Sequence, residues 1–150
     1  MSGALALTVL IAQVIGSVGM FGVIWTIQLV HYPLMRAVPA DAFVRYEELH
    51  TRAISMVVGP LMAVEGVCVL AVFFFRPEGV PTWSTWAGGV AEAVAIGVTA
   101  FVSAPTHGRL EGGFDAGLLD RLIATNWFRT LAWTARAGLA VFMLVAHLNR

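Results

Sequence analysis

Four long apolar runs dominate this sequence and leave few folds open to it. They cover residues 4–30, 53–75, 83–104 and 127–146. A helix needs about 20 apolar residues to cross the hydrocarbon core of a bilayer, and each run is long enough. The composition agrees, since 59% of the 150 residues are hydrophobic and only 12% are charged, which is typical of membrane proteins. We therefore predict an all-α integral membrane four-helix bundle that forms a single transmembrane domain over residues 1–150.

The charge and cysteine content exclude several classes of function. The formal net charge is zero, so the chain has no basic surface with which to neutralise nucleic-acid phosphates. The single cysteine, Cys68, lies inside an apolar run and can form neither an internal disulfide nor a CxxC-type metal site. The partners we expect are the lipid bilayer, a lipophilic small molecule, and a larger membrane complex or further copies of the chain.

Arginine is distributed unevenly between the two ends of the predicted spans. Six arginines lie in or beside the connections between spans one and two and between spans three and four, namely Arg36, Arg45, Arg52, Arg109, Arg121 and Arg129. The other end has Arg76 and Arg150. Because cytoplasmic loops are enriched in arginine and lysine, we predict a protein of the bacterial inner (cytoplasmic) membrane with both termini outside.

The two arginine-rich connections have helical patterns of their own. Residues 40–52 and 114–125 contain good helix formers, and we expect each segment to run into the span that follows it. Helix breakers precede both segments, namely Pro33 and Pro39 in the first connection and Pro105 and Gly112-Gly113 in the second.

The two halves of the chain also resemble each other weakly. An ungapped shift of 76 positions places His31 on His107, Ala40 on Ala116 and Arg45 on Arg121. This pattern favours two similar helical hairpins, related by a pseudo-two-fold axis along the membrane normal.

Three ionisable residues are predicted deep in the membrane. Glu65 and Glu92 each lie 15 residues from a histidine, His50 and His107 respectively, or roughly 22 Å along a helix. Arg136 on the fourth span is the natural partner of either carboxylate, because a lone charge in hydrocarbon is costly. The three residues form either a ligand-binding or proton-relay site or a structural ion pair that sets helix register.

Three histidines are predicted near the cytoplasmic interface. His31, His50 and His107 each lie at a helix end, and Glu47 precedes His50 by one turn on the same face. Three imidazoles and a carboxylate suit a transition metal, and two of the imidazoles, His31 and His107, would suit the axial positions of a haem. The alternative is that these histidines hydrogen-bond backbone carbonyls and lipid headgroups. The cofactor therefore stays open.

A polar stripe runs along the fourth span. Asn126, Arg129, Trp133 and Arg136 follow one another at spacings of three, four and three, which places them on one helix face. We expect this face to lie close to the functional site.

These residues carry a resemblance to a known family. His31, the Pro105-Thr106-His107 turn with Leu110 behind it, and the stripe with Trp127 resemble the small four-span proteins of the anthrone-oxygenase-like family, most of which have no assigned function. The resemblance covers nearly the whole chain, although Gly108 stands where members usually have Asn. It implies a four-helix membrane fold and oxidation of a flat aromatic substrate without a familiar cofactor. The residues carried over are His107, Asn126, Trp127, Arg129 and Arg136.

Three functions fit this sequence. The first is a membrane-embedded oxidoreductase, or a protein that binds a redox cofactor or a lipophilic aromatic molecule. In such a protein, His107 or His31 would act as a base or metal ligand, and Arg129 would stabilise an oxyanion. The faces of Trp127 and Trp133 would contact a flat ring. The alternatives are a non-catalytic accessory subunit of a photosynthetic or respiratory complex, and a small transporter or proton relay. The candidate catalytic residues are His107, Asn126 and Arg129, and the candidate ligand-binding residues are Trp127, Trp133, Arg136, Glu65 and Glu92.

Overall fold

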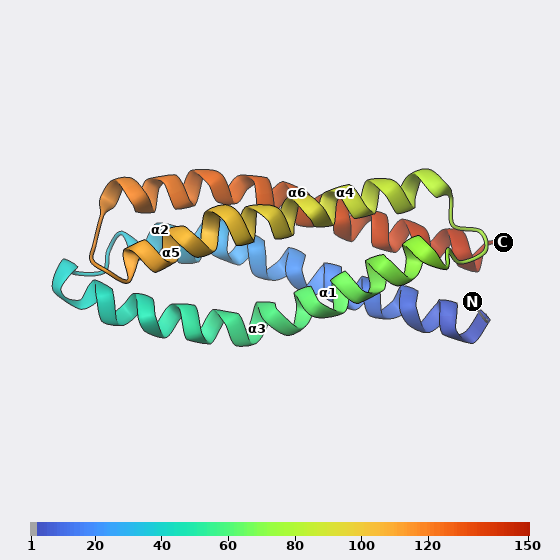
Figure 1. Ribbon diagram of the computed structural model, residues 1–150, viewed down its shortest axis with the longest axis horizontal. Helices are drawn as coiled ribbons and strands as arrows, with labels where there is room; N and C mark the ends of the chain where they lie inside the picture. Colours follow the sequence, from blue (N-terminus) through green and yellow to red (C-terminus); the bar gives the residue numbers. More distant parts are fainter. Residues whose placement is uncertain (1–2) are drawn as a thin grey trace.

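The computed structural model describes residues 3–150 and consists of four long helices (Figure 1). The first comprises α1 (Gly3–Thr26), the π-helical segment η1 (Ile27–His31) and α2 (Tyr32–Met35). The second is α3 (Ala40–Phe74). The third comprises α4 (Thr82–Val98), the π-helical segment η2 (Thr99–Ser103) and α5 (Ala104–Leu110). The fourth is α6 (Ala116–Leu148). The described residues contain no strand, and the predicted all-α four-helix bundle is confirmed.

Each of the four helices is long and apolar enough to cross a membrane. They contain 33, 35, 29 and 33 residues, or roughly 44–53 Å at the rise of an α-helix, which exceeds the hydrocarbon thickness of about 30 Å. Large apolar side chains such as Met56, Phe101 and Phe128 are exposed on the outside of the bundle. This is the surface that lipid chains contact in a bilayer. The protein is an integral membrane bundle whose helices project beyond the hydrocarbon core.

The α2–α3 and α5–α6 connections lie at one end of the bundle, which we call the connection end. At this end the helices extend further than the apolar runs alone indicate. Segment 40–52 is the first part of α3, and segment 114–125 leads into α6, so both run into the following span as predicted. Pro39 precedes α3, and the Asp115 side chain caps α6 by accepting a hydrogen bond of 3.0 Å from the Leu118 amide. Local sequence therefore accounts for both helix starts.

The helices break at Pro39 and at Gly112-Gly113 as predicted, but the breaks predicted at Pro33 and Pro105 are wrong. The chain stays helical through both prolines, and each proline lies two residues beyond a π-helical segment. A proline ring clashes with the carbonyl four residues before it and donates no hydrogen bond, and a wider turn relieves both problems without ending the helix. The two segments are related by 72 positions, not by the shift of 76 that places His31 on His107, so this device does not follow the predicted repeat.

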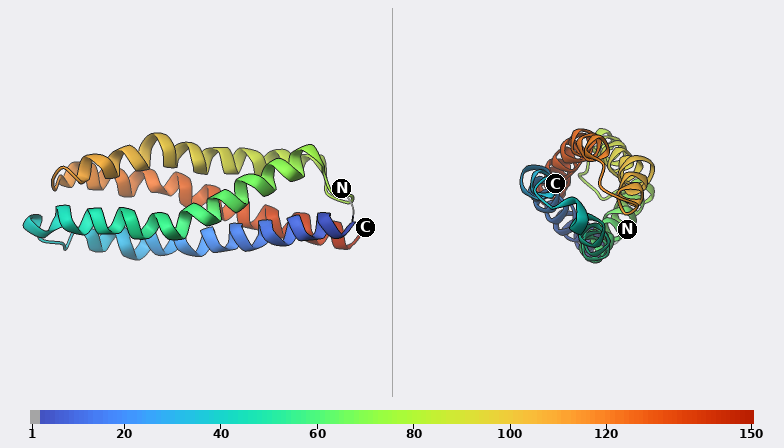
Figure 2. Two further views of the ribbon diagram at one scale, coloured as in Figure 1. Left: turned by 60° about the horizontal axis from the view of Figure 1, so that its bottom comes forward. Right: turned by 90° about the vertical axis from the view of Figure 1, so that its left-hand side faces the viewer.

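The four helices surround a common axis, and both termini lie at one end of the bundle (Figure 2). α6 packs against α1 and α4, and α3 packs against α1. A large apolar cluster centred on Trp133 occupies the connection end, and a smaller one around Leu10 and Met143 occupies the end with the termini. A polar layer separates them, because Ser17 on α1 and Arg136 on α6 fall between the two clusters along their helices.

Candidate functional site

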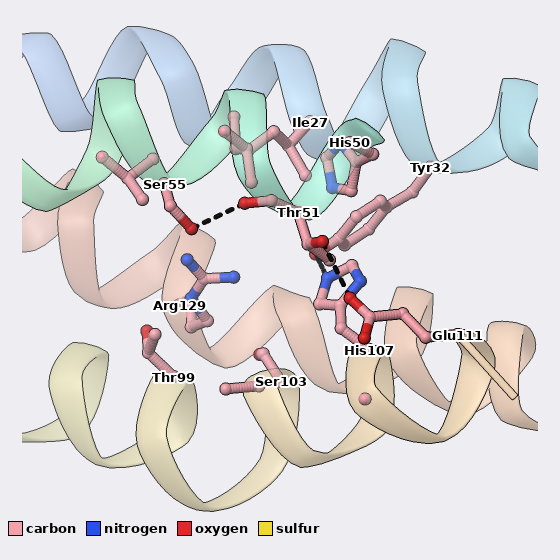
Figure 3. A pocket seen from close by; sticks show the side chains of 14 residues that line it. Ile27, Tyr32, His50, Thr51, Ser55, Thr99, Ser103, His107, Glu111 and Arg129 are labelled. Carbon is pink, nitrogen blue, oxygen red and sulfur yellow. Dashed lines mark hydrogen bonds between the residues drawn. The ribbon is translucent and has the colours of Figure 1, made fainter. Parts of the chain in front are cut away.

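A cavity of about 350 Å³ lies at the connection end of the bundle, bounded by α3, η2, α5 and α6 (Figure 3). Its polar lining comes from every one of these elements and from α2, and consists of Tyr32, His50, Thr51, Ser55, Thr99, Ser103, His107, Glu111 and Arg129. Its apolar wall comes from Ile27, Ile54 and Val58. At the mouth, the Thr51 hydroxyl donates to Glu111 Oε1 at 2.8 Å and joins α3 to the end of α5.

A hydrogen-bonded chain of three side chains borders this cavity. Glu47, fully buried on α3, accepts a short hydrogen bond on Oε1 from His107 Nδ1. The other ring nitrogen, His107 Nε2, lies 3.0 Å from the Tyr32 hydroxyl. With Glu47 as a carboxylate, Nδ1 carries the proton, and the lone pair of Nε2 faces the Tyr32 hydroxyl. The carboxylate thus orients the imidazole as a base toward Tyr32 and the cavity.

The predicted metal ligands gather at this place, but they do not form a metal site. The His31 and His50 rings stack with centroids 4.3 Å apart, and His31 Nε2 lies 3.3 Å from the Tyr46 hydroxyl. Both nitrogens of His107 are engaged by Glu47 and the Tyr32 hydroxyl. Over residues 3–150, no group of three or more His, Cys, Asp or Glu side chains is arranged to hold a metal ion. The transition-metal centre predicted from His31, His50, His107 and Glu47 is therefore corrected to a hydrogen-bonded cluster.

The positions of the three imidazole rings bear on the haem that the sequence left open. His31 and His107 would have to bind iron from opposite faces of one macrocycle. The His50 ring lies against both, with centroid distances of 4.3 Å to His31 and 5.3 Å to His107, and so occupies the space that a haem would need.

Arg129 brings a buried positive charge to the cavity. Its side chain reaches the cavity from α6 (Figure 3), and Nη1 donates to Asn126 Oδ1 at 3.0 Å. Asn126 in turn donates to Gln28 Oε1 at 2.8 Å. Among the described residues, Arg129 forms no ion pair and its Nε has no hydrogen-bond partner. The Asn126 amide, itself held by Gln28, fixes the cation in place, and no carboxylate neutralises its charge.

Other predicted site residues lie away from the cavity. Asn126 is completely buried behind Arg129 and positions it, so Asn126 is not placed to contact a ligand in the cavity. Trp133 is completely buried in the apolar core. Trp127 is 40% exposed and packs edge-to-face on Trp25, with centroids 5.8 Å apart. Neither tryptophan is among the residues that line the cavity.

The deep ionisable residues form a second, separate cluster. Arg136 Nε lies 2.9 Å from Glu65 Oε2 and 3.6 Å from Glu92 Oε2, so the predicted pairing is confirmed for both carboxylates. The Ser17 hydroxyl also donates to Glu65 Oε2 at 2.6 Å. All four residues of the predicted stripe on α6 are buried. The stripe therefore faces the interior, but its two arginines belong to different sites.

Two glycines leave room for this deep cluster. A Cβ atom on Gly16 would lie 2.8 Å from Glu65 Oε1, and one on Gly88 would lie 2.9 Å from Arg136 Nη1. Side-chain atoms do not approach a Cβ so closely, so a larger residue at either position would push the paired groups apart.

Gly88→Ala is expected to lower the free energy of unfolding by about 1–3 kcal/mol, the usual cost of overpacking a core. The guanidinium of Arg136 cannot move away without lengthening its contacts with Glu65 and Glu92. Gly89→Ala is the matched control, since nothing lies within 4 Å of its added Cβ and alanine favours the helix. Unfolding of both variants in mixed micelles measures the difference. Equal stabilities would mean that the guanidinium is free to move.

Several residues of these sites were not predicted. Tyr32, Ser17 and Gln28 contact His107, Glu65 and Asn126 respectively. The sequence places Gln13, Ser17 and Gln28 as polar residues within the first apolar run, but nothing local indicates which partner each one meets. Tyr32 follows η1 directly, and a π-helical segment changes the face on which the next side chain lies.

Comparison with known proteins gives no match. No family model fits the sequence, and no curated protein and no solved structure matches it.

Proposed function

We propose that this protein binds a small lipophilic molecule with an acidic hydroxyl or activated C–H group and removes its proton inside the membrane. The observation that carries this proposal is the placement of the Glu47–His107–Tyr32 chain and the unpaired Arg129 cation around one cavity. The apolar wall of the cavity suits a ring system, and about 350 Å³ lies at the lower end of the size range of small-molecule sites.

The chemistry divides between a base and an electrostatic group. His107 Nε2 accepts the proton through the Tyr32 hydroxyl, and Glu47 stabilises the resulting imidazolium. Arg129 faces the same space and stabilises the negative charge that develops on the ligand oxygen, as a fixed cation does in a site shielded from water. Arg129 Nε and Ser103 Oγ, which have no partner within residues 3–150, are further groups for hydrogen bonds to the ligand.

Oxidation is the reaction that the family resemblance implies, and these groups suit its first step. An anthrone carries an activated ring CH₂ group, and transfer of one of its protons to His107 leaves an anion whose oxygen Arg129 would stabilise. Dioxygen is the oxidant in this proposal, and the CH₂ group and O₂ together give a C=O group and H₂O. Oxygen uptake with anthrone as substrate, lost in His107→Gln, distinguishes an oxidase from a binding protein.

We further propose that the cavity end faces the cytoplasm of a bacterial inner membrane. The arginine excess at that end supports this orientation, and it places both termini outside.

Binding of 2-naphthol to the protein in lipid nanodiscs tests the site. This two-ring phenol is lipophilic, and its absorption and emission differ between the hydroxyl and the anion. Arg129→Gln is expected to weaken binding about 10- to 100-fold, because a hydrogen bond to a charged group contributes about 1.5–3 kcal/mol. His107→Gln should bind the phenol but lose the spectrum of the anion, because glutamine cannot accept the proton.

Arg121→Gln is the matched control, since Arg121 lies on the same helix with an exposed side chain. It should bind 2-naphthol as the unaltered protein does. If Arg129→Gln and His107→Gln also show unaltered affinity and unaltered spectra, the cavity is not the binding site.

A further inference from the structure

The deep cluster contains one more carboxyl group than it has cations. Glu65 and Glu92 both approach the single guanidinium of Arg136, and all three side chains are almost completely buried. They lie between the two apolar clusters of the bundle, where the helices face lipid on the outside. Two carboxylates and one guanidinium would leave an uncompensated negative charge in a medium where that is very costly.

No other group from the packed elements supplies the missing positive charge. Besides these three residues, α1 contributes Ser17 and Gln13, α3 contributes the thiol of Cys68, and α4 contributes Thr85. Across residues 3–150, Glu65 and Glu92 form ion pairs with Arg136 alone. The cation must therefore come from outside the chain.

The space beside the cluster limits what that cation is. The void beside Arg136, lined by Gln13, Thr85 and Gly89, has no measurable room for a water molecule, and neither carboxyl group borders it. A hydrated metal ion does not fit such a void. A proton needs no volume, because it forms a bond to one carboxylate oxygen.

The hydrogen bonds indicate which carboxyl group carries it. Glu65 Oε2 accepts from Ser17 at 2.6 Å and lies 2.9 Å from Arg136 Nε, which stabilises a carboxylate. Neither oxygen of Glu92 has a hydrogen-bond partner among the described residues, and its contact with Arg136 is longer, at 3.6 Å. Burial without partners favours the neutral acid.

We propose that the Glu65–Glu92 pair is a proton-binding site in the membrane interior, which holds one proton on Glu92 at neutral pH. This site is separate from the cavity around His107 and does not depend on the function proposed for it.

Infrared spectroscopy of the protein in nanodiscs tests this directly, because a protonated carboxyl group absorbs at a carbonyl frequency that a carboxylate lacks. The unaltered protein is expected to show this band at neutral pH, shifted to lower frequency in D₂O. Glu92→Gln and Glu65→Gln should each abolish it, since one carboxylate beside one guanidinium needs no proton. Glu48→Gln, an exposed position on α3, should keep it.

The proposal makes a second, independent prediction that does not rely on loss of a signal. Glutamine has nearly the shape of protonated glutamic acid, so Glu92→Gln should unfold at the same temperature as the unaltered protein at neutral pH. Absence of the band from the unaltered protein, or its persistence in both Glu65→Gln and Glu92→Gln, would overturn the proposal. So would a clear drop in the unfolding temperature of Glu92→Gln.

Discussion

Arg136→Met should destabilise the bundle by about 3–5 kcal/mol, the cost of removing one partner from a buried ion pair. The change leaves the Ser17 hydroxyl as the remaining hydrogen-bond donor to Glu65 among the described residues and leaves Glu92 with no cation. Glu65, the carboxylate of the pair, must then take up a proton or stay charged in the interior, and either outcome favours the unfolded state. Unfolding in mixed micelles, followed by loss of helical circular dichroism, measures the change in free energy.

A triple variant separates the charge effect from the loss of packing. Glu65→Gln with Glu92→Gln and Arg136→Met removes every charge, and most of the stability should return, because buried ion pairs are often no better than neutral side chains of similar volume. Arg121→Met on the exposed face of the same helix is the control and should change stability by less than about 0.5 kcal/mol. If Arg136→Met matched this control, the cluster would contribute nothing to the fold.

Trp133→Ala is the second substitution with a large expected effect, about 3–5 kcal/mol. Trp133 is completely buried within the larger apolar cluster, so its removal leaves a cavity that the surrounding helices cannot close. Inside a membrane the loss arises mainly from packing, since helices there are not driven together by exclusion of water. The same unfolding measurement applies.

Trp127→Ala on the same helix is the matched control for this substitution. Trp127 is partly exposed and contacts Trp25 by its edge, so we expect a loss well below that of Trp133→Ala and unchanged binding of 2-naphthol. The sequence predicted both residues as ligand contacts. Weakened 2-naphthol binding in Trp127→Ala, at unchanged stability, would restore that interpretation for Trp127.

The sequence by itself determined the four-helix architecture and the helix face on which the polar residues lie. Hydrocarbon offers no partners to the backbone, so a long apolar run has to be a helix, and four such runs make four membrane-crossing helices. The spacing of Asn126, Arg129, Trp133 and Arg136 placed them on one face by helix geometry alone. That Arg136 pairs with Glu65 or Glu92 also followed from the sequence, because an isolated charge at that depth is too costly, and the structure shows that it approaches both.

Only the tertiary structure decided which side chains meet. The helical period predicts the face of its helix on which a residue lies, but it does not predict how each helix is rotated about its own axis relative to its neighbours. That rotation brings Tyr32 into contact with His107 and Asn126 into contact with Gln28. The π-helical turns before Pro33 and Pro105 change that register locally, where the sequence indicated breaks. The histidines illustrate the consequence. Their shared depth was readable from their positions, but the stacking of His31 on His50 and the engagement of both nitrogens of His107 depend on angles that depth does not specify.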